Sequence, residues 1–137
     1  MTSPKDDSVL HAEAVAFDMD GTLIESTGLI SRLWREWSAR RGVDTGALLV
    51  ASRGRKAIDT VRQFAPPGVG PETEAELLSR LAAEETEGLR PITGAATVLR
   101  ALPKGRWAIV TSAERELAAL LLLTSTSPGF GLKAAFR

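Results

Sequence analysis

The chain has 137 residues, 17 basic and 17 acidic side chains, and no cysteine. A net charge of zero gives no global field to attract nucleic acid, and the absence of cysteine excludes disulfides, thiolate metal sites and cysteine nucleophiles. The polar start at 1–8 lacks the apolar centre of a signal peptide, and the aliphatic run at 120–123 is too short to cross a bilayer. We therefore expect a cytoplasmic protein with one core that acts on neither nucleic acid nor membranes.

The most informative stretch is residues 16–23, AFDMDGTL. It overlaps a short apolar run at 14–17 that predicts a buried strand. Asp18 and Asp20 come at the end of this strand, two residues apart, so both carboxylates are expected on one side of the extended backbone. Gly21 allows a sharp turn close to a ligand. Because burying carboxylates costs stability, the pair predicts a site for Mg²⁺ and phosphate.

These two carboxylates suit phosphoryl transfer. Asp18 is expected to attack phosphorus and form an aspartyl-phosphate, which divides one difficult displacement into two easier ones. Asp20 is expected to protonate the departing alkoxide and then to take a proton from the hydrolytic water. Mg²⁺ bound by Asp18 and Asp20 would offset the repulsion between the anionic nucleophile and the anionic substrate.

The same motif has two alternative interpretations. An EF-hand loop also places aspartates before a glycine, but aligning Gly21 with that glycine puts Ala16 and Thr27 at the first and last ligand positions. Neither residue supplies the carboxylate that calcium needs. A chance pair of surface aspartates is the other alternative, and the preceding strand argues against it.

Between the two predicted strands the pattern is helical. Four apolar residues share one face of a first helix that Gly42 ends; they are Ile30, Leu33, Trp34 and Trp37. Asp44 is expected to cap a second helix, and a third runs through 57–64 until two prolines break it. The fourth begins near Pro71 and is predicted to end at Gly88. These helices predict a lid over the site.

A second apolar strand is predicted at 107–110, followed by Thr111 and Ser112. Parallel α/β sheets bind their ligands at the carboxyl ends of strands. Thr111 is expected to donate its hydroxyl to a phosphate oxygen, and Ser112 to cap the next helix while backbone N–H groups face the anion. Without the aspartate motif, Thr111 would be interpreted only as a turn residue and Ser112 only as a helix cap.

The motif at 16–23 resembles the first motif of the haloacid dehalogenase-like hydrolase superfamily. Residues 92–95 and 102–112 are similar to the approach to its second motif, most of all in small sugar-phosphate and glycerol-phosphate phosphatases. The resemblance implies an α/β fold in which a Rossmann-like parallel sheet core receives an inserted α-helical cap. The corresponding boundaries are 10–26 and 89–137 for the core and 27–88 for the cap.

The resemblance also implies Mg²⁺-dependent hydrolysis of a small phosphorylated sugar or polyol. An aspartate at position 20 is the mark of the phosphatases and phosphomutases, as opposed to the dehalogenases. Gly54 and Arg55 match the cap element that contacts substrate in the resembling phosphatases. The residues expected to bind substrate or phosphate are Gly21, Thr22, Gly54, Arg55, Thr111 and Ser112.

The superfamily's third motif, a lysine, and its fourth, an acidic pair, are not found after Glu116. We therefore expect a core that is incomplete on its C-terminal side, and weak or absent activity unless a second chain supplies the missing parts. An open sheet edge and exposed apolar surface are expected to accompany this. Two alternatives to the phosphatase stay open, a non-catalytic remnant of such an enzyme and a phosphosugar mutase.

Overall fold

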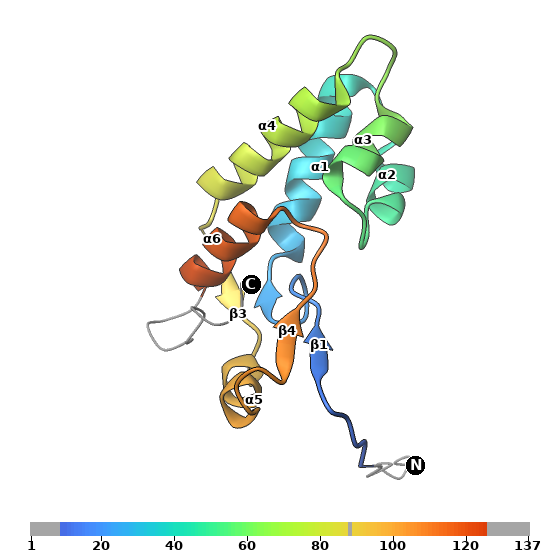
Figure 1. Cartoon of the computed structure of the whole chain (residues 1–137). Helices are drawn as coiled ribbons and strands as arrows, with labels where there is room; N and C mark the ends of the chain where they lie inside the picture. The colour runs from blue at the N-terminus through green and yellow to red at the C-terminus, as the bar shows by residue number, and fades with distance from the viewer. Residues whose placement is uncertain (1–8, 88, 126–137) are drawn as a thin grey trace, which may run out of the picture.

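The computed structural model describes residues 9–87 and 89–125 (Figure 1). The strands are β1 (Val15–Phe17), β2 (Ile24–Glu25), β3 (Arg90–Pro91) and β4 (Trp107–Ile109). The helices are α1 (Thr27–Arg41), α2 (Thr45–Ala51), α3 (Ala57–Phe64), α4 (Pro71–Glu84), α5 (Ala95–Ala101) and α6 (Arg115–Ser125). The predicted polar start at 1–8 and the core segment at 126–137 lie outside the described residues.

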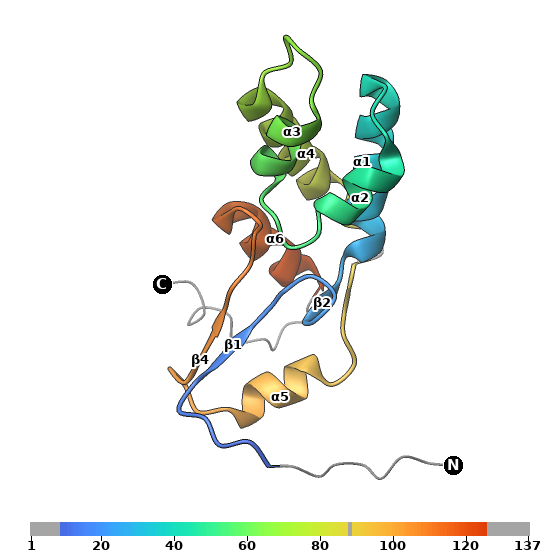
Figure 2. The ribbon, with the colours of Figure 1, turned by 90° about the vertical axis from the view of Figure 1, so that its right-hand side faces the viewer.

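The fold is α/β, as predicted, with β1 and β4 paired in parallel. Their register joins Val15 to Trp107 and Phe17 to Ile109, and the N–H of Val110 extends it by donating to the Phe17 carbonyl at 2.8 Å. β2 and β3 form a separate antiparallel pair. Figures 1 and 2 both place α1–α4 at one end of the molecule and α5 at the other, with β1 and β4 between them. We call α1–α4 and their connections the helical segment.

The two parallel strands are only half-buried, which corrects the prediction of buried strands. Phe17 and Trp107 are partly covered, with their rings in edge-to-face contact at 6.5 Å, and both pack against the cluster around Leu99 on α5. Ala16 and Ala108 are exposed. Because successive side chains of a strand point to opposite faces, only one face of this pair is covered within the described residues.

Most of the helix boundaries lie close to the predicted residues. Gly42, at φ +66°, ends α1, and Asp44 caps α2 by accepting from the N–H of Ala47 at 2.6 Å. Pro71 is the first residue of α4. The predicted end of α4 at Gly88 is wrong, because the helix stops at Glu84. Glu85 has left helical geometry at φ −103° and ψ +53°, and its carboxylate pairs with Arg32 of α1.

The core of the helical segment centres on Trp37, which is fully buried and lies edge-to-face with Trp34 at 5.7 Å. The Trp37 Nε1 donates to Glu74 of α4 at 2.7 Å, and Arg41 forms an ion pair with the same carboxylate. Leu121 of α6 belongs to the same apolar cluster, so α6 joins the helical segment to the strands. Within residues 9–87 and 89–125, none of the helices has the length and apolar character that crossing a membrane requires.

Candidate active site

The turn after β1 is built around one buried residue. Met19 is fully buried, and its carbonyl accepts from the N–H groups of Thr22, Leu23 and Ile24 at 3.2, 2.9 and 3.1 Å. Gly21 has a φ of +73°, a conformation that favours glycine, and its N–H donates to the Ile24 carbonyl at 2.8 Å. The tight turn therefore fixes the backbone on both sides of Met19.

The two aspartates of this turn differ in environment. Asp18 is exposed, whereas Asp20 is half-buried and accepts a hydrogen bond from the hydroxyl of Ser26. Burial raises the pKa of Asp20, and the nearby charge of Asp18 raises it further, while the Ser26 hydrogen bond lowers it in part. The result is an exposed carboxylate beside a half-buried one that holds its proton more readily than a free aspartate does. This is the division of roles expected of a nucleophile and an acid–base group.

The residues after β4 reach the same edge of the sheet. Since Phe17 pairs with Ile109, the chain segments that follow β1 and β4 emerge side by side. Thr111 Oγ1 accepts from the N–H of Ala113 at 3.2 Å, which orders the turn. The prediction that Ser112 caps the next helix is wrong, because α6 begins three residues later at Arg115.

A cleft of about 510 Å³ lies between this sheet edge and the helical segment. The sheet side of its lining consists of Asp18, Val110, Thr111 and Ser112. The side from the α2–α3 connection and α3 consists of Gly54, Arg55, Lys56 and Asp59. The volume is in the range of small-molecule sites.

The cleft brings together five of the predicted site residues from three parts of the sequence. They are Asp18, Gly54, Arg55, Thr111 and Ser112. Asp20, Gly21 and Thr22 are not part of its lining; they lie in the turn that directly follows Asp18. Their assigned roles in binding and catalysis stay predictions.

Sequence reasoning missed three residues of the lining. Val110 was assigned only to a strand, although it is 63% exposed. Lys56 directly follows the predicted Arg55, which is the signal that was available for it. Asp59 lies in the first turn of α3, which begins two residues after Arg55, and no sequence pattern marked it.

The donor set available to a metal is the pair Asp18 and Asp20. Within residues 9–87 and 89–125, no group of three or more acidic, histidine or cysteine side chains is arranged to hold a metal ion. Mg²⁺ is commonly bound by one or two carboxylates together with substrate phosphate and water. Burial is the main cause of the raised pKa of Asp20, and the charge of Asp18 adds to it; a cation would relieve this repulsion between the two carboxylates. The pair therefore fits Mg²⁺ in the presence of a phosphate ligand.

Sequence comparison matches this chain to one hydrolase family and to phosphatases that act on small molecules. A family model described as haloacid dehalogenase-like hydrolase matches residues 12–128. Hexitol phosphatase A of Escherichia coli (strain K12) is 34% identical over 113 residues, which cover 80% of this chain and 52% of that protein. Glycerol-1-phosphate phosphohydrolase 2 of Saccharomyces cerevisiae is 31% identical, covering 80% and 45%. The chain thus spans about half the length of these relatives.

Solved structures share the fold. A candidate phosphoglycolate phosphatase from Lactobacillus plantarum superposes with a TM-score of 0.67 at 21% identity, over 90% of this chain and 59% of that one. A HAD family hydrolase from Deinococcus radiodurans R1, with bound phosphate and sodium, gives a TM-score of 0.51 at 28% identity, over 90% and 55%.

Proposed function

The chain belongs to the haloacid dehalogenase-like hydrolase family, and on that premise we propose that it hydrolyses a small phosphorylated sugar or polyol. The observation that carries the proposal is the cleft that joins Asp18 to Thr111 and Arg55. The names of relatives that act on hexitol and glycerol phosphates support the substrate class. We further propose that residues 27–88 act as a cap over a core made of 10–26 and 89–137.

In the proposed reaction a carboxylate oxygen of Asp18 attacks phosphorus, and the bond from phosphorus to the substrate oxygen breaks. Asp20 gives its proton to the departing alkoxide, so an alcohol leaves and an aspartyl-phosphate stays on Asp18. Asp20, now a carboxylate, takes a proton from water as the water attacks phosphorus. The bond between phosphorus and the Asp18 oxygen breaks, inorganic phosphate leaves, and both aspartates return to their starting states.

The environment of each aspartate supports this assignment. Asp18 is exposed in the cleft, where it can reach a phosphorus atom, and burial raises the pKa of Asp20, the direction that favours a proton donor. Ser26 is 1% exposed and gives the Asp20 carboxylate a fixed hydrogen-bond partner. We also propose that Gly21 and Thr22 contact the phosphate, since they lie in the turn that positions both carboxylates.

Mg²⁺ is the proposed cofactor, with Asp18 and Asp20 as its protein ligands. When bound it would neutralise phosphate charge and favour approach of the anionic nucleophile. Thr111 would donate its hydroxyl to a phosphate oxygen, with Ser112 beside it. Arg55 and Gly54 would contact the substrate from the opposite side of the cleft.

The proposal is tested by phosphate release from a panel of sugar and polyol phosphates, with Mg²⁺ or with a chelator. The chain and its Asp18→Asn variant are compared, because the amide keeps the shape of the carboxylate without its nucleophilicity. Release by the wild type alone, and only with Mg²⁺, is the expected result. Equal release by the variant would overturn the mechanism. Absence of release from a folded sample would favour a non-catalytic protein, and isomerisation of a hexose phosphate would favour a mutase.

A further inference from the structure

The helical side of the cleft carries an acidic side chain that phosphate binding does not explain. Asp59 lines the same cleft as Asp18, Arg55 and Lys56. A carboxylate repels a phosphate group, so its presence in a phosphate-binding cleft is unfavourable unless another part of the ligand compensates. A ligand group that donates a hydrogen bond to Asp59 would compensate for this repulsion.

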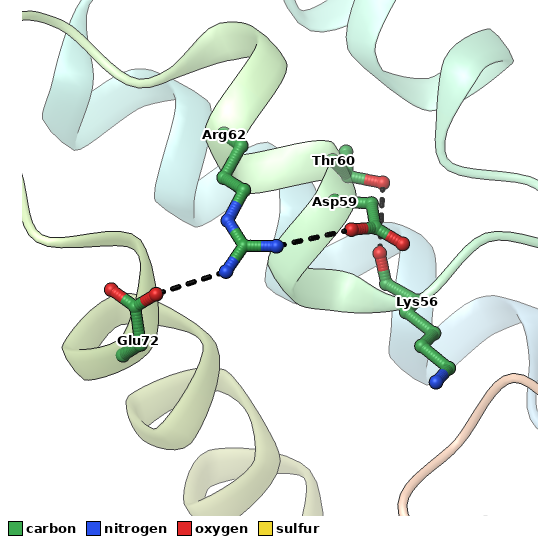
Figure 3. A network of polar contacts seen from close by, with 5 residues as sticks. All are labelled: Lys56, Asp59, Thr60, Arg62 and Glu72. Atoms are coloured by element: carbon green, nitrogen blue, oxygen red, sulfur yellow. Dashed lines mark hydrogen bonds and ion pairs between the residues drawn. The ribbon is translucent and has the colours of Figure 1, made fainter.

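The backbone holds Lys56 and Asp59 at a fixed separation. The Lys56 carbonyl accepts from the N–H of Asp59 at 3.1 Å and from the N–H of Thr60 at 3.2 Å. The Thr60 hydroxyl, which is buried, also approaches this carbonyl at 3.4 Å (Figure 3). These bonds fix the backbone of Lys56 relative to that of Asp59 at the start of α3, where one cationic and one anionic residue line the cleft.

Asp59 takes part in a side-chain network with Arg62 and Glu72. Arg62 donates through Nη1 to Asp59 Oδ1 at 3.5 Å and through Nη2 to Glu72 Oε1 of α4 at 3.0 Å. Figure 3 shows the Arg62 guanidinium between the two carboxylates. Within the described residues, the hydrogen bond from Arg62 engages Oδ1 of Asp59 and leaves Oδ2 available as an acceptor.

The surrounding charges select the kind of donor. Arg55 and Lys56 line the cleft beside Asp59, so a positively charged ligand group would gain from one anion and lose to two cations. A neutral hydroxyl has no such conflict, because it can donate to Asp59 and accept from Lys56. Two neighbouring hydroxyls would satisfy both side chains.

We propose that Asp59, positioned by Arg62, accepts a hydrogen bond from a hydroxyl of the substrate and selects hydroxylated phosphate esters over plain alkyl phosphates. This assignment rests on the proposed phosphatase function and specifies which part of the substrate the helical side recognises. The alternative role for Asp59 is structural, as an acidic residue in the first turn of a helix paired with Arg62 three residues on.

The test compares glycerol phosphate with n-propyl phosphate, which has the same carbon chain without the two hydroxyls. The quantity measured is the ratio of their kcat/KM values. We expect the wild type to prefer glycerol phosphate by roughly tenfold or more, the range of one hydrogen bond to a charged group. Asp59→Ala is expected to reduce the ratio to about twofold or less, mainly through KM.

Glu72→Gln is the matched control, because Glu72 bonds to the same arginine but does not line the cleft. It is expected to keep the ratio within about twofold of the wild type, since an amide oxygen still accepts from Arg62. An equal loss of preference in both variants would overturn the proposal and favour the structural role. A wild type that does not discriminate, or that prefers phosphoethanolamine to glycerol phosphate, would also overturn it.

Calorimetric dissociation constants for the same ligands separate this proposal from the proposed function. If no ester is hydrolysed but the wild type binds glycerol phosphate tighter than propyl phosphate in an Asp59-dependent manner, the hydrolase function fails and the recognition stands. If both esters are hydrolysed with equal efficiency and bound with equal affinity, the recognition fails and the hydrolase stands. If neither ester is bound or hydrolysed, both proposals are wrong.

Discussion

The two sides of the cleft hold their polar side chains by different means. On the sheet side, Asp18 and Thr111 follow directly from β1 and β4, so the parallel register of the strands sets their positions. On the helical side, Arg55 donates a hydrogen bond to Gln63 and Asp59 accepts one from Arg62, and both partners are side chains of α3. Positions set by the backbone are suited to the groups that act on the bond that breaks. Positions set by side chains can change without disturbing the sheet, and they suit the choice of substrate.

Apart from loss of the nucleophile Asp18, the largest expected effect is on the sheet side, at Asp20. Asp20→Asn removes the group that protonates the leaving alcohol, and we expect kcat to fall by roughly 10²–10⁴-fold. If the sheet side acts on the phosphoryl group alone, the loss should be similar for glycerol and propyl phosphates. Steady-state kinetics with both esters measures this. A loss of kcat confined to one ester would contradict the assignment of the sheet side to the phosphoryl group and of the helical side to the rest of the substrate.

Arg55→Ala tests the helical side, with a smaller expected effect. Removing a cation from the cleft should raise KM by roughly tenfold and leave kcat within a few-fold, because the reacting atoms lie on the other side. Arg53→Ala is the control, since Arg53 is exposed and is not part of the cleft lining. Equal effects of the two substitutions would show that only the general charge of this region matters.

Glu74 tests the stability of the helical segment separately from the cleft, because it is not part of the cleft lining. Burial raises the pKa of Glu74, but hydrogen bonds from Arg41 and Trp37 and the charges of Arg41 and Arg40 outweigh it and leave the pKa below 4.5. Glu74→Gln replaces the carboxylate and should cost about 1–3 kcal/mol of unfolding free energy at neutral pH.

The pH dependence of this difference follows from the direction of the shift. A lowered native pKa means that the Glu74 carboxylate contributes stability above about pH 4.5, and this contribution disappears as the pH falls through the lowered value. Denaturant unfolding of wild type and variant from pH 7 to pH 3 should therefore show a difference that closes on acidification. A difference that stays constant over this range would contradict the role of the charge.

The smallest expected effect is that of Ser26→Ala on the sheet side. The Ser26 hydrogen bond lowers the pKa of Asp20, so its loss should raise that pKa further. Because Asp20 acts first as an acid, the alkaline limb of the kcat profile should move to higher pH, with kcat lower by about fivefold or less. Ser38→Ala, a buried serine bonded within the helical segment, is the control and should leave the pH profile in place.

Sequence patterns predicted the sheet side better than the helical side, for a physical reason. The carboxyl ends of parallel strands meet at one edge, so Asp18 and Thr111 could be placed together without knowing any packing. Helix ends were also accessible where a local signal marks them, as with Gly42 and Asp44. The end of α4 was not, because the helix stops at Glu84, four residues before the glycine that the pattern marks as its end.

The residues missed on the helical side depend on how α3 is rotated about its axis. Thr60 and Val61 are both fully buried, and this packing turns Lys56 and Asp59 toward the cleft. One helix read alone does not reveal which charged residues face a partner and which face water. The half-burial of β1 and β4 has a similar origin, since alternation along a strand does not tell how many faces its neighbours cover.

The antiparallel pair of β2 and β3 has a consequence for how such a chain can change over evolutionary time. Ile24 lies opposite Pro91 and Glu25 opposite Arg90, so the chain leaves the strand region for the helical segment and returns from it at neighbouring points. A segment whose two ends are adjacent can be lengthened, shortened or exchanged as one module without moving the strands. The β2–β3 pair is thus the natural junction for building chimaeras that keep one chemistry and acquire another specificity.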